Sequence, residues 1–400
     1  MSNNSFAFVV PRYGKKIAGG CETLVREFAE RLAKNGDNVD VLSTCAIDNR
    51  TWENALKEEE KVEDGVNVKR FLVDDRDLEK WIPYQIELSA NKMISVDEQL
   101  TWMKNGVNST RLYEYIKNNE TKYRAIFFAP YLFGTTFWGS LVAPKKSILI
   151  PCLHDEIYAY TDIVASMFRQ VRGCVFNALP EKTLAQSLYG EDIKGDSVGM
   201  GFILPKNEEQ EALKPYFDDE FNYILYVGRK ETGKNVHLLI DYFTSLKDGA
   251  KLPKDLKLVI AGGGSFEDLQ RKEAKNREDI IDIGYVSEED KQRLIKHSLL
   301  LCQPSVNESF SIVIMEAWGL RVPVLVNGFC QVTAYHVKNS EGGFTFSNKR
   351  EFASSVNNIL QEKLDNNSIR ANKGYEYVKE KYNWDAIIKK FYKTVDGILS

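Results

Sequence analysis

Residues 299–326 constrain the fold of this 400-residue chain more than any other segment. Short apolar runs stand at its two ends, 299–304 and 324–326, and the first of them ends at a proline. Such runs are typical of strands that are buried on both faces, as in a parallel sheet. The apolar stretch between them has the length of a helix, which we expect to begin near Ser311. The segment therefore predicts a strand, a loop, a helix and a second strand in one βαβ unit.

Two glutamates, Glu308 and Glu316, bracket the start of the expected helix. In a doubly wound sheet, ligands bind beyond the carboxyl ends of the strands, where the next helix presents unpaired N–H groups and the positive end of its dipole. A phosphate would be stabilised there by the backbone N–H groups of Phe310, Ser311 and Ile312. Glu316, about one and a half turns into the helix, could accept hydrogen bonds from two vicinal hydroxyls. The layout suits a nucleotide-sugar, although two glutamates at this spacing are, taken alone, more often solvated residues.

A glycine pair lies between the first predicted strand, at 6–10, and a helical pattern at 23–34. A strand, a glycine-containing loop and a helix in this order are typical of the opening of a Rossmann-type half. The loop lacks the spacing of the dinucleotide-binding fingerprint, so an ordinary tight turn explains it as well as a ligand does. As part of a site, Gly19 and Gly20 would let backbone N–H groups approach a phosphate closely.

Three charged or titratable side chains also follow predicted strands. His154 comes after the strand at 147–151, and this position favours a role in a site over a structural hydrogen bond. Arg229 and Lys234 lie in the turn after the strand at 221–227. Two cations there would neutralise a diphosphate leaving group, whereas charged turn residues in general belong to the solvated surface.

Strands and helices alternate in two series, and the charged, proline-containing stretch 206–219 separates them. We therefore predict an α/β protein with two Rossmann-like domains facing each other across a cleft. The expected divisions are an N-terminal, acceptor-side domain at 1–205, a C-terminal, nucleotide-sugar-binding domain at 206–380, and a last helix at 381–400 that packs back on the N-terminal domain. The segment 76–119 is rich in large aromatic side chains. We expect it to form helical core, and an acceptor-facing or membrane-facing surface is the alternative.

Composition argues against several other classes of protein. The net charge of −4 implies no nucleic-acid partner. The six cysteines are scattered without a C-x-x-C pair and there are only four histidines, so we expect free thiols and no metal site. No apolar run approaches the roughly 20 residues that span a bilayer, and the N-terminus lacks the features of a signal peptide. We expect a cytoplasmic protein, with peripheral association at the inner face of the cell membrane left open.

With these residues in place, the chain resembles the retaining glycosyltransferases of GT-B fold in glycosyltransferase family 4. This is the E-x7-E type, which includes sucrose synthases and bacterial surface-polysaccharide transferases. The resemblance covers nearly the whole chain and is strongest at 226–327, through Arg229, Lys234, the glycine run 262–264 and the Glu308 to Glu316 segment.

The resemblance implies a role for each candidate residue. Glu308 is expected to contact the donor sugar, Glu316 to hold the ribose hydroxyls, and Arg229 and Lys234 to stabilise the diphosphate. His154 is expected near the donor sugar. The remaining expected substrate contacts come from a glycine loop that faces the diphosphate and from the backbone at the helix start: Gly19, Gly20, Phe310, Ser311 and Ile312. The resemblance implies no bound metal and no cofactor other than the UDP- or GDP-linked sugar.

The chain also departs from the pattern of that family. The family usually has glycines on both sides of Phe310, where this chain has Ser309 and Ser311, and a glycine where this chain has Asn235. The stretch 328–331 lacks the usual glycine pair. These departures concern the identity of the donor sugar more than they concern the reaction.

The resulting prediction is transfer of a hexosyl unit from a UDP- or GDP-sugar to a hydroxyl of a glycan or glycolipid, with retention of configuration. Lipopolysaccharide or capsule biosynthesis is the expected pathway. One alternative is a sugar-nucleotide epimerase of GT-B fold, which needs no acceptor. The other is a non-catalytic subunit that binds a glycan or nucleotide on a degenerate GT-B scaffold, and the intact set of Glu308, Glu316, Arg229 and Lys234 argues against it.

Overall fold

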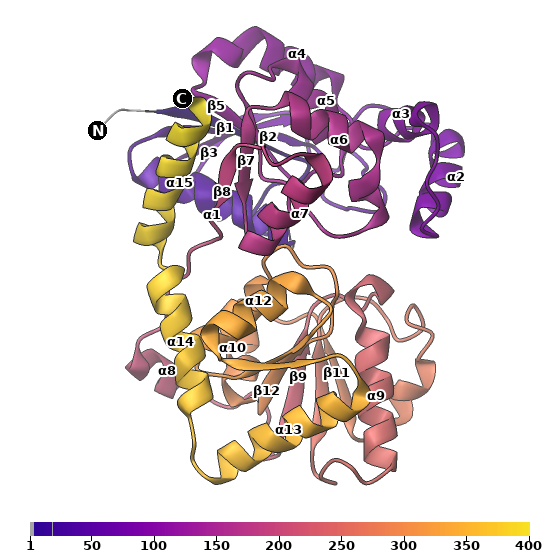
Figure 1. Ribbon diagram of the computed structural model, residues 1–400, viewed down its shortest axis with the longest axis vertical. Coiled ribbons are helices and arrows are strands. Elements are labelled where there is room, and N and C mark those ends of the chain that lie inside the picture. The colour runs from indigo at the N-terminus through magenta and orange to yellow at the C-terminus, as the bar shows by residue number, and fades with distance from the viewer. Residues whose placement is uncertain (1–3, 18) are drawn as a thin grey trace. The chain divides into compact units, whose positions relative to one another are not determined.

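The computed structural model describes residues 4–17 and 19–400, which divide into two compact units (Figure 1). Unit 1 comprises Met1–Met200 and Ile387–Ser400, and unit 2 comprises Gly201–Ala386. Each unit has its own sheet and its own core. The sequence analysis placed the two divisions at residues 205 and 380, whereas the units divide after Met200 and after Ala386.

Unit 1 contains, within the described residues, an eight-stranded sheet in the order β3-β4-β2-β1-β5-β6-β7-β8. Its neighbouring strands are parallel except for the antiparallel pair β3 and β4. The strands are β1 Ser5–Val10, β2 Asn38–Thr44, β3 Glu60–Glu63, β4 Val66–Phe71, β5 Ala125–Phe128, β6 Ser147–Leu149, β7 Gly173–Phe176 and β8 Gly195–Ser197. The α-helices are α1 Gly20–Lys34, α2 Leu78–Ser89, α3 Val96–Lys104, α4 Thr110–Asn119, α5 Gly134–Val142, α6 Asp162–Gln170 and α7 Leu179–Tyr189, and α15 Trp384–Leu399 belongs to this unit from Ile387 onward.

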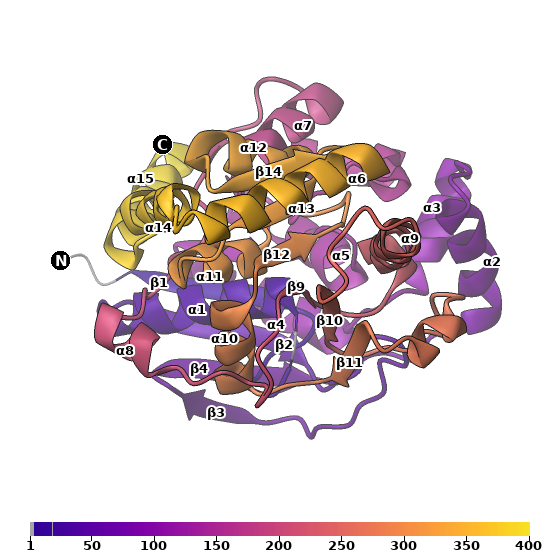
Figure 2. The ribbon, with the colours of Figure 1, turned by 90° about the horizontal axis from the view of Figure 1, so that it is seen from below.

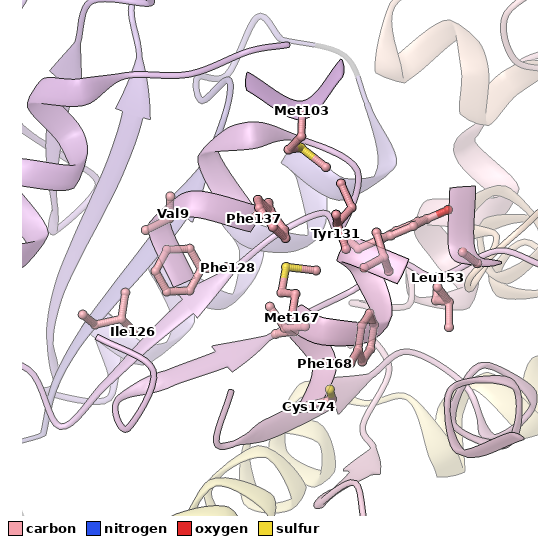
Figure 3. Close-up of a cluster of buried hydrophobic side chains, with 14 of the residues drawn as sticks. Val9, Met103, Ile126, Phe128, Tyr131, Phe137, Leu153, Met167, Phe168 and Cys174 are labelled. Carbon is pink, nitrogen blue, oxygen red and sulfur yellow. The ribbon is translucent and has the colours of Figure 1, made fainter. Parts of the chain in front are cut away.

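The central strands of unit 1 are buried on both faces, which is why they appear in the sequence as continuous apolar runs. One face packs against helices α3, α5 and α6, and Figure 3 shows this cluster, to which Val9 and Phe128 contribute from the strands and Met103, Phe137 and Met167 from the helices. On the other face, rings of the strands meet rings of α1 and α15, namely Phe6, Phe8, Phe127, Phe28 and Phe391. The C-terminal helix is therefore part of the core of unit 1.

Unit 2 contains, in the part of the chain that is described, a six-stranded parallel sheet in the order β11-β10-β9-β12-β13-β14. Its strands are β9 Tyr223–Val227, β10 Lys257–Ala261, β11 Ile280–Gly284, β12 Leu300–Gln303, β13 Val324–Asn327 and β14 Gly343–Phe346. Its α-helices are α8 Asn207–Ala212, α9 Val236–Asp248, α10 Glu288–His297, α11 Ile312–Gly319, α12 Gln331–Ser340, α13 Lys349–Leu364 and α14 Ile369–Lys381. Four short 3-10 helices complete the elements of the described chain: η1 Glu120–Lys122, η2 Ile157–Tyr160, η3 Thr232–Lys234 and η4 Lys272–Asn276.

Close packing at the C-terminal end of α11 fixes the position of this helix. Helices α9 and α13 cover one face of the unit 2 sheet, and α10 and α11 lie on the other (Figure 2). Trp318 of α11 is fully buried and donates its indole N–H to the carbonyl of Gly342 at 2.8 Å. A side chain on Gly374 of α14 would overlap the Trp318 ring, so the absence of a side chain there lets α14 lie against α11. The N-terminal end of α11 is thereby held in place at the carboxyl edge of the sheet.

In both sheets the direction of winding reverses once. In unit 2 the reversal lies between β9 and β12, and in unit 1 it lies between β1 and β5. Ligands of doubly wound sheets bind at such a switch point, beyond the carboxyl ends of the strands. The two places to search for a site are therefore the loops after β9 and β12 and the loops after β1 and β5.

Several elements differ from the sequence-based expectation. The charged stretch 206–219, expected to be a linker, contains helix α8, and the short strands β3 and β14 and helix α12 were not predicted. Helix α11 begins at Ile312, one residue after the expected start. Among the described residues, no helix is long and apolar enough to cross a membrane.

Candidate functional site

An ion pair joins the two loops that meet at the switch point of unit 2. Lys234, the last residue of η3 after β9, donates from Nζ to Oε1 of Glu308 at 2.7 Å. Glu308 lies in the loop after β12, and its side chain is 12% exposed. Because the pair is partly shielded from water, its attraction is stronger than that of a surface pair. It holds Glu308 beside the start of α11.

Glu316 has a partner that the sequence analysis missed. Lys291 of α10 donates from Nζ to Oε1 of Glu316 at 2.8 Å and also pairs with Glu288 at 2.7 Å. Burial raises the pKa of Glu316, and the Lys291 ammonium opposes that rise. A signal for Lys291 was present in the sequence, since it lies three and four residues before the buried Leu294 and Ile295 and therefore on the inward face of α10.

The turn after β9 separates its three cations. Arg229 pairs with Glu231 at 2.9 Å and is 56% exposed, so in this structure it lies at the surface and not on Glu308. Lys230, between the predicted pair, is buried and donates to the carbonyl of Gly262 at 2.6 Å and to Asp282 at 2.9 Å. Lys230 thus ties the turn to the ends of β10 and β11, and its charged neighbours in sequence gave no sign of this role.

At the start of α11, the side chain of Phe310 is buried in the protein, so the groups that it leaves for a ligand are those of the backbone. The ring of Phe310 is buried and lies against Phe202, His336 and Tyr382, with centroid distances of 6.2, 5.3 and 5.2 Å. Ser311 is the residue before the helix, and Ile312 is its first residue. The unpaired N–H groups of a first helical turn are an anion-binding element, so this end of α11 can accept a phosphate group.

In unit 1, the predicted glycines lie at the start of α1. Gly20 begins the helix and Gly19 precedes it. A Cβ atom on Gly19 would lie 2.0 Å from a carboxylate oxygen of Glu22, and Arg12 holds that carboxylate in an ion pair. A side chain at position 19 would therefore displace the Glu22 carboxylate from its place beside Arg12. A Cβ atom on Gly20 would meet open space, so position 20 has no steric need for a glycine.

His154 lies beyond the end of β6 and next to a buried acidic network. Its Nδ1 is 3.4 Å from Oε1 of Glu156, which also accepts the hydroxyl of Tyr131 at 3.0 Å. The backbone N–H of Leu153 donates to the buried Glu181 at 2.7 Å. Burial raises the pKa of Glu181 to about 8. These contacts fix the backbone on both sides of His154 and leave its ring about a quarter exposed.

The switch point of unit 1 carries an aromatic group that sequence reasoning did not single out. Arg12, after β1, donates to the carbonyl of Ile47 at 3.0 Å, and its guanidinium carbon lies 5.7 Å from the ring centroid of Trp52. Trp52 in turn packs against Phe133, after β5, at 5.1 Å. Trp52 has a φ of 58°, which is a strained conformation for a bulky side chain. In the described chain, no group of three or more His, Cys, Asp and Glu side chains is arranged to hold a metal ion.

Comparison with known proteins finds a family match within unit 2. Residues 207–381 match the family model of glycosyl transferases group 1. An uncharacterized glycosyltransferase of Methanocaldococcus jannaschii is 30% identical over 179 residues, which are 43% of this chain and 44% of that relative. The match thus spans less than half of the relative's length.

Comparison with solved structures covers both units. The sucrose-phosphate synthase of Thermosynechococcus elongatus superposes with a TM-score of 0.71 at 15% identity, over 98% of this chain and 99% of that one. The Anabaena protein HepE, solved with UDP and glucose, gives a TM-score of 0.70 at 15% identity, with the same coverage. These likenesses confirm the predicted fold class, an α/β chain of two Rossmann-like domains. Residues 207–381 are therefore similar to the glycosyl transferases group 1 family, in a chain of the GT-B fold.

Proposed function

We propose that this chain is a retaining glycosyltransferase that transfers a hexosyl unit from a UDP- or GDP-sugar to a hydroxyl of a glycan or glycolipid. The observation that carries the proposal is the Lys234–Glu308 pair beside the start of α11, at the switch point of a domain similar to the glycosyl transferases group 1 family. The complex of HepE with UDP and glucose supports a nucleotide-sugar as donor.

Different residues of unit 2 bind different parts of the donor. The N–H groups of Phe310, Ser311 and Ile312 and the positive end of the α11 dipole stabilise the diphosphate. Lys234 adds a cation, and Arg229, which is largely exposed, would reach the same group by exchanging its ion pair with Glu231 for one with the phosphate. Charge that develops on the departing phosphate is thereby neutralised without a bound metal.

The two glutamates hold different parts of the same donor. Glu316 accepts the ribose hydroxyls through its carboxylate, which Lys291 holds in place by an ion pair. Glu308 accepts a hydroxyl of the donor sugar. The bond between the anomeric carbon and the phosphate oxygen breaks as the acceptor oxygen bonds to the same face of that carbon, and the departing phosphate oxygen takes the acceptor proton.

For unit 1 we propose that His154 contacts the donor sugar and that the Gly19–Gly20 turn contacts the diphosphate, as the resemblance implies. Surface-glycan biosynthesis at the cytoplasmic side of the membrane is proposed on the same basis. The aromatic helices α2, α3 and α4 are candidates for acceptor contact, since α2 exposes Leu78, Ile82 and Ile86 along one side.

Product analysis with UDP- and GDP-sugars tests this function. Transfer predicts release of UDP or GDP that depends on an added glycan or glycolipid, and a glycoside with the anomeric configuration of the donor. An epimerised sugar formed without any acceptor would establish the epimerase instead. Binding of a nucleotide without turnover, under any acceptor, would leave the non-catalytic subunit as the function.

A further inference from the structure

Ser311 occupies a backbone conformation that disfavours a side chain. Its φ of 70° and ψ of 79° lie in the left-handed region, where residues with a Cβ atom are strained and glycine is not. Ser309, two residues earlier, is not among the residues with positive φ. The strain therefore belongs to position 311 and not to the loop as a whole.

The hydroxyl of Ser311 does not offset this strain within the protein. Serines at helix starts commonly accept a hydrogen bond from the first turn, yet Ser311 makes no such side-chain cap bond. The residue is only 6% exposed, and its Oγ has no hydrogen-bond partner within the described residues. A buried hydroxyl without a hydrogen-bond partner in the protein is unfavourable, so position 311 combines two unfavourable features.

The surroundings of Ser311 prevent relaxation. The preceding Phe310 is locked into an aromatic cluster with His336 and Tyr382, and Trp318 anchors the other end of α11. A second buried polar atom without a partner, Oε1 of Gln303, belongs to the last residue of β12, where the loop toward Ser311 begins. Strained and unsatisfied groups that a rigid scaffold holds in place are typical of ligand sites.

We propose that the hydroxyl of Ser311 donates a hydrogen bond to a diphosphate oxygen of the nucleotide-sugar, an inference that rests on the proposed function. The ligand meets the first-turn N–H groups of α11 at the same place, and a hydrogen bond to a charged acceptor is about twice as strong as one between neutral groups. Ser311 is thus a donor-binding residue whose side chain, and not only its backbone, binds the diphosphate. The cost of the left-handed serine in the free protein is repaid on binding.

Ser311→Gly distinguishes a ligand-binding role from a structural one. We expect it to stabilise the free protein and to weaken binding of the nucleotide. Without ligand, the melting temperature should rise, since glycine removes both the strain and the unsatisfied hydroxyl. The dissociation constant for UDP or GDP, whichever the wild type binds, should increase about tenfold or more in calorimetric titration. Ser311→Ala should lose the same affinity while it keeps the strain.

Two controls make the test specific. Ser309→Gly is the same substitution at a partly exposed neighbour and should leave the nucleotide affinity within about twofold, which is far below the loss of a charged hydrogen bond. The nucleoside without phosphates should bind wild type and Ser311→Gly equally, because the lost contact is to the diphosphate.

Two results would overturn the inference, and they are distinguishable. If Glu316→Gln weakens UDP or GDP binding but Ser311→Gly leaves it within twofold, the role of the hydroxyl is wrong and the proposed function stands. If the wild type binds neither nucleotide, both the function and the inference fail.

Discussion

Both units have a sheet whose winding reverses once, but different contacts hold the loops together at the two switch points. At the edge of unit 2, ion pairs tie the loop after β9 to the loop after β12, through Lys234–Glu308, and to strand β11, through Lys230–Asp282. At the edge of unit 1, the loops after β1, β2 and β5 are tied mainly by rings, through Trp52 on Phe133 and under the Arg12 guanidinium.

This difference indicates what each set of contacts does. Fixed cations and helix N–H groups favour a phosphate-bearing ligand, whereas the Trp52 ring is buried and holds the loops of unit 1 together. Unit 1 also has two buried hydroxyls at the start of α5, on Thr135 and Thr136, that lack partners among the described residues. The same fold thus supplies a charged edge and an aromatic edge.

The largest expected effect concerns the aromatic edge. Trp52→Ala removes the ring that packs on Phe133 and should lower the free energy of unfolding by about 3 kcal/mol, as for other buried large-to-small changes. Urea unfolding followed by the fluorescence of the remaining tryptophans measures it. A loss below about 1 kcal/mol would mean that rings do not hold this edge together.

The next effect concerns the charged edge. Lys234→Ala should lower kcat of donor consumption by about 100-fold, since a charged contact to the leaving group is lost. Lys275→Ala is the matched control, because Lys275 forms an equally short ion pair of 2.7 Å at the surface of the same unit. If both substitutions lowered kcat equally, Lys234 would have no more effect on the reaction than an ordinary surface lysine.

A smaller effect is expected at Lys291. Lys291→Met leaves the partly buried Glu316 without its cation, which should lower the free energy of unfolding by about 2 kcal/mol. It should also raise the pKa of Glu316 further, because burial and the Glu288 charge then act on it unopposed. The donor KM of the variant should therefore increase more at low pH than at high pH, and a parallel shift at all pH values would contradict the role of Lys291.

The smallest effect is a pH dependence of stability from His336, which packs behind Phe310. Burial lowers the pKa of His336 to about 3 from an ordinary value of 6.5. The unfolded chain takes up the proton first, so stability is complete above pH 6.5 and is lost as the pH falls toward 3. Between pH 7.5 and pH 5.5, the free energy of unfolding should fall by about 1 kcal/mol less in His336→Phe than in the wild type. Urea titration at both pH values measures this difference. An unchanged pH dependence would show that His336 is already protonated in the folded chain.

The sequence was sufficient to predict those helices and strands that a local pattern of apolar residues marks. The apolar runs of β9, β12 and β13 and the apolar stretch of α11 predicted the unit that positions Glu308 and Glu316. Because parallel strands must end at one edge, the loops after them could be assigned to one site before the structure was known.

The rest depended on tertiary contacts that no local pattern contains. Lys230 and Arg229 are adjacent cations in one turn, yet one is buried on Asp282 and the other is exposed. Strand β14, Gly343–Phe346, is only four residues long, and it is a strand because β13 pairs with it. The left-handed backbone of Ser311 likewise follows from the anchoring of Phe310 and not from the identity of the serine.

A crystal structure of the chain with UDP or GDP tests the central claim most directly. The account predicts the diphosphate at the first turn of α11, within hydrogen-bond distance of Lys234 Nζ and the Ser311 hydroxyl, and the ribose hydroxyls on Glu316. A nucleotide bound elsewhere, with neither Lys234 nor Glu316 in contact with it, would contradict the account.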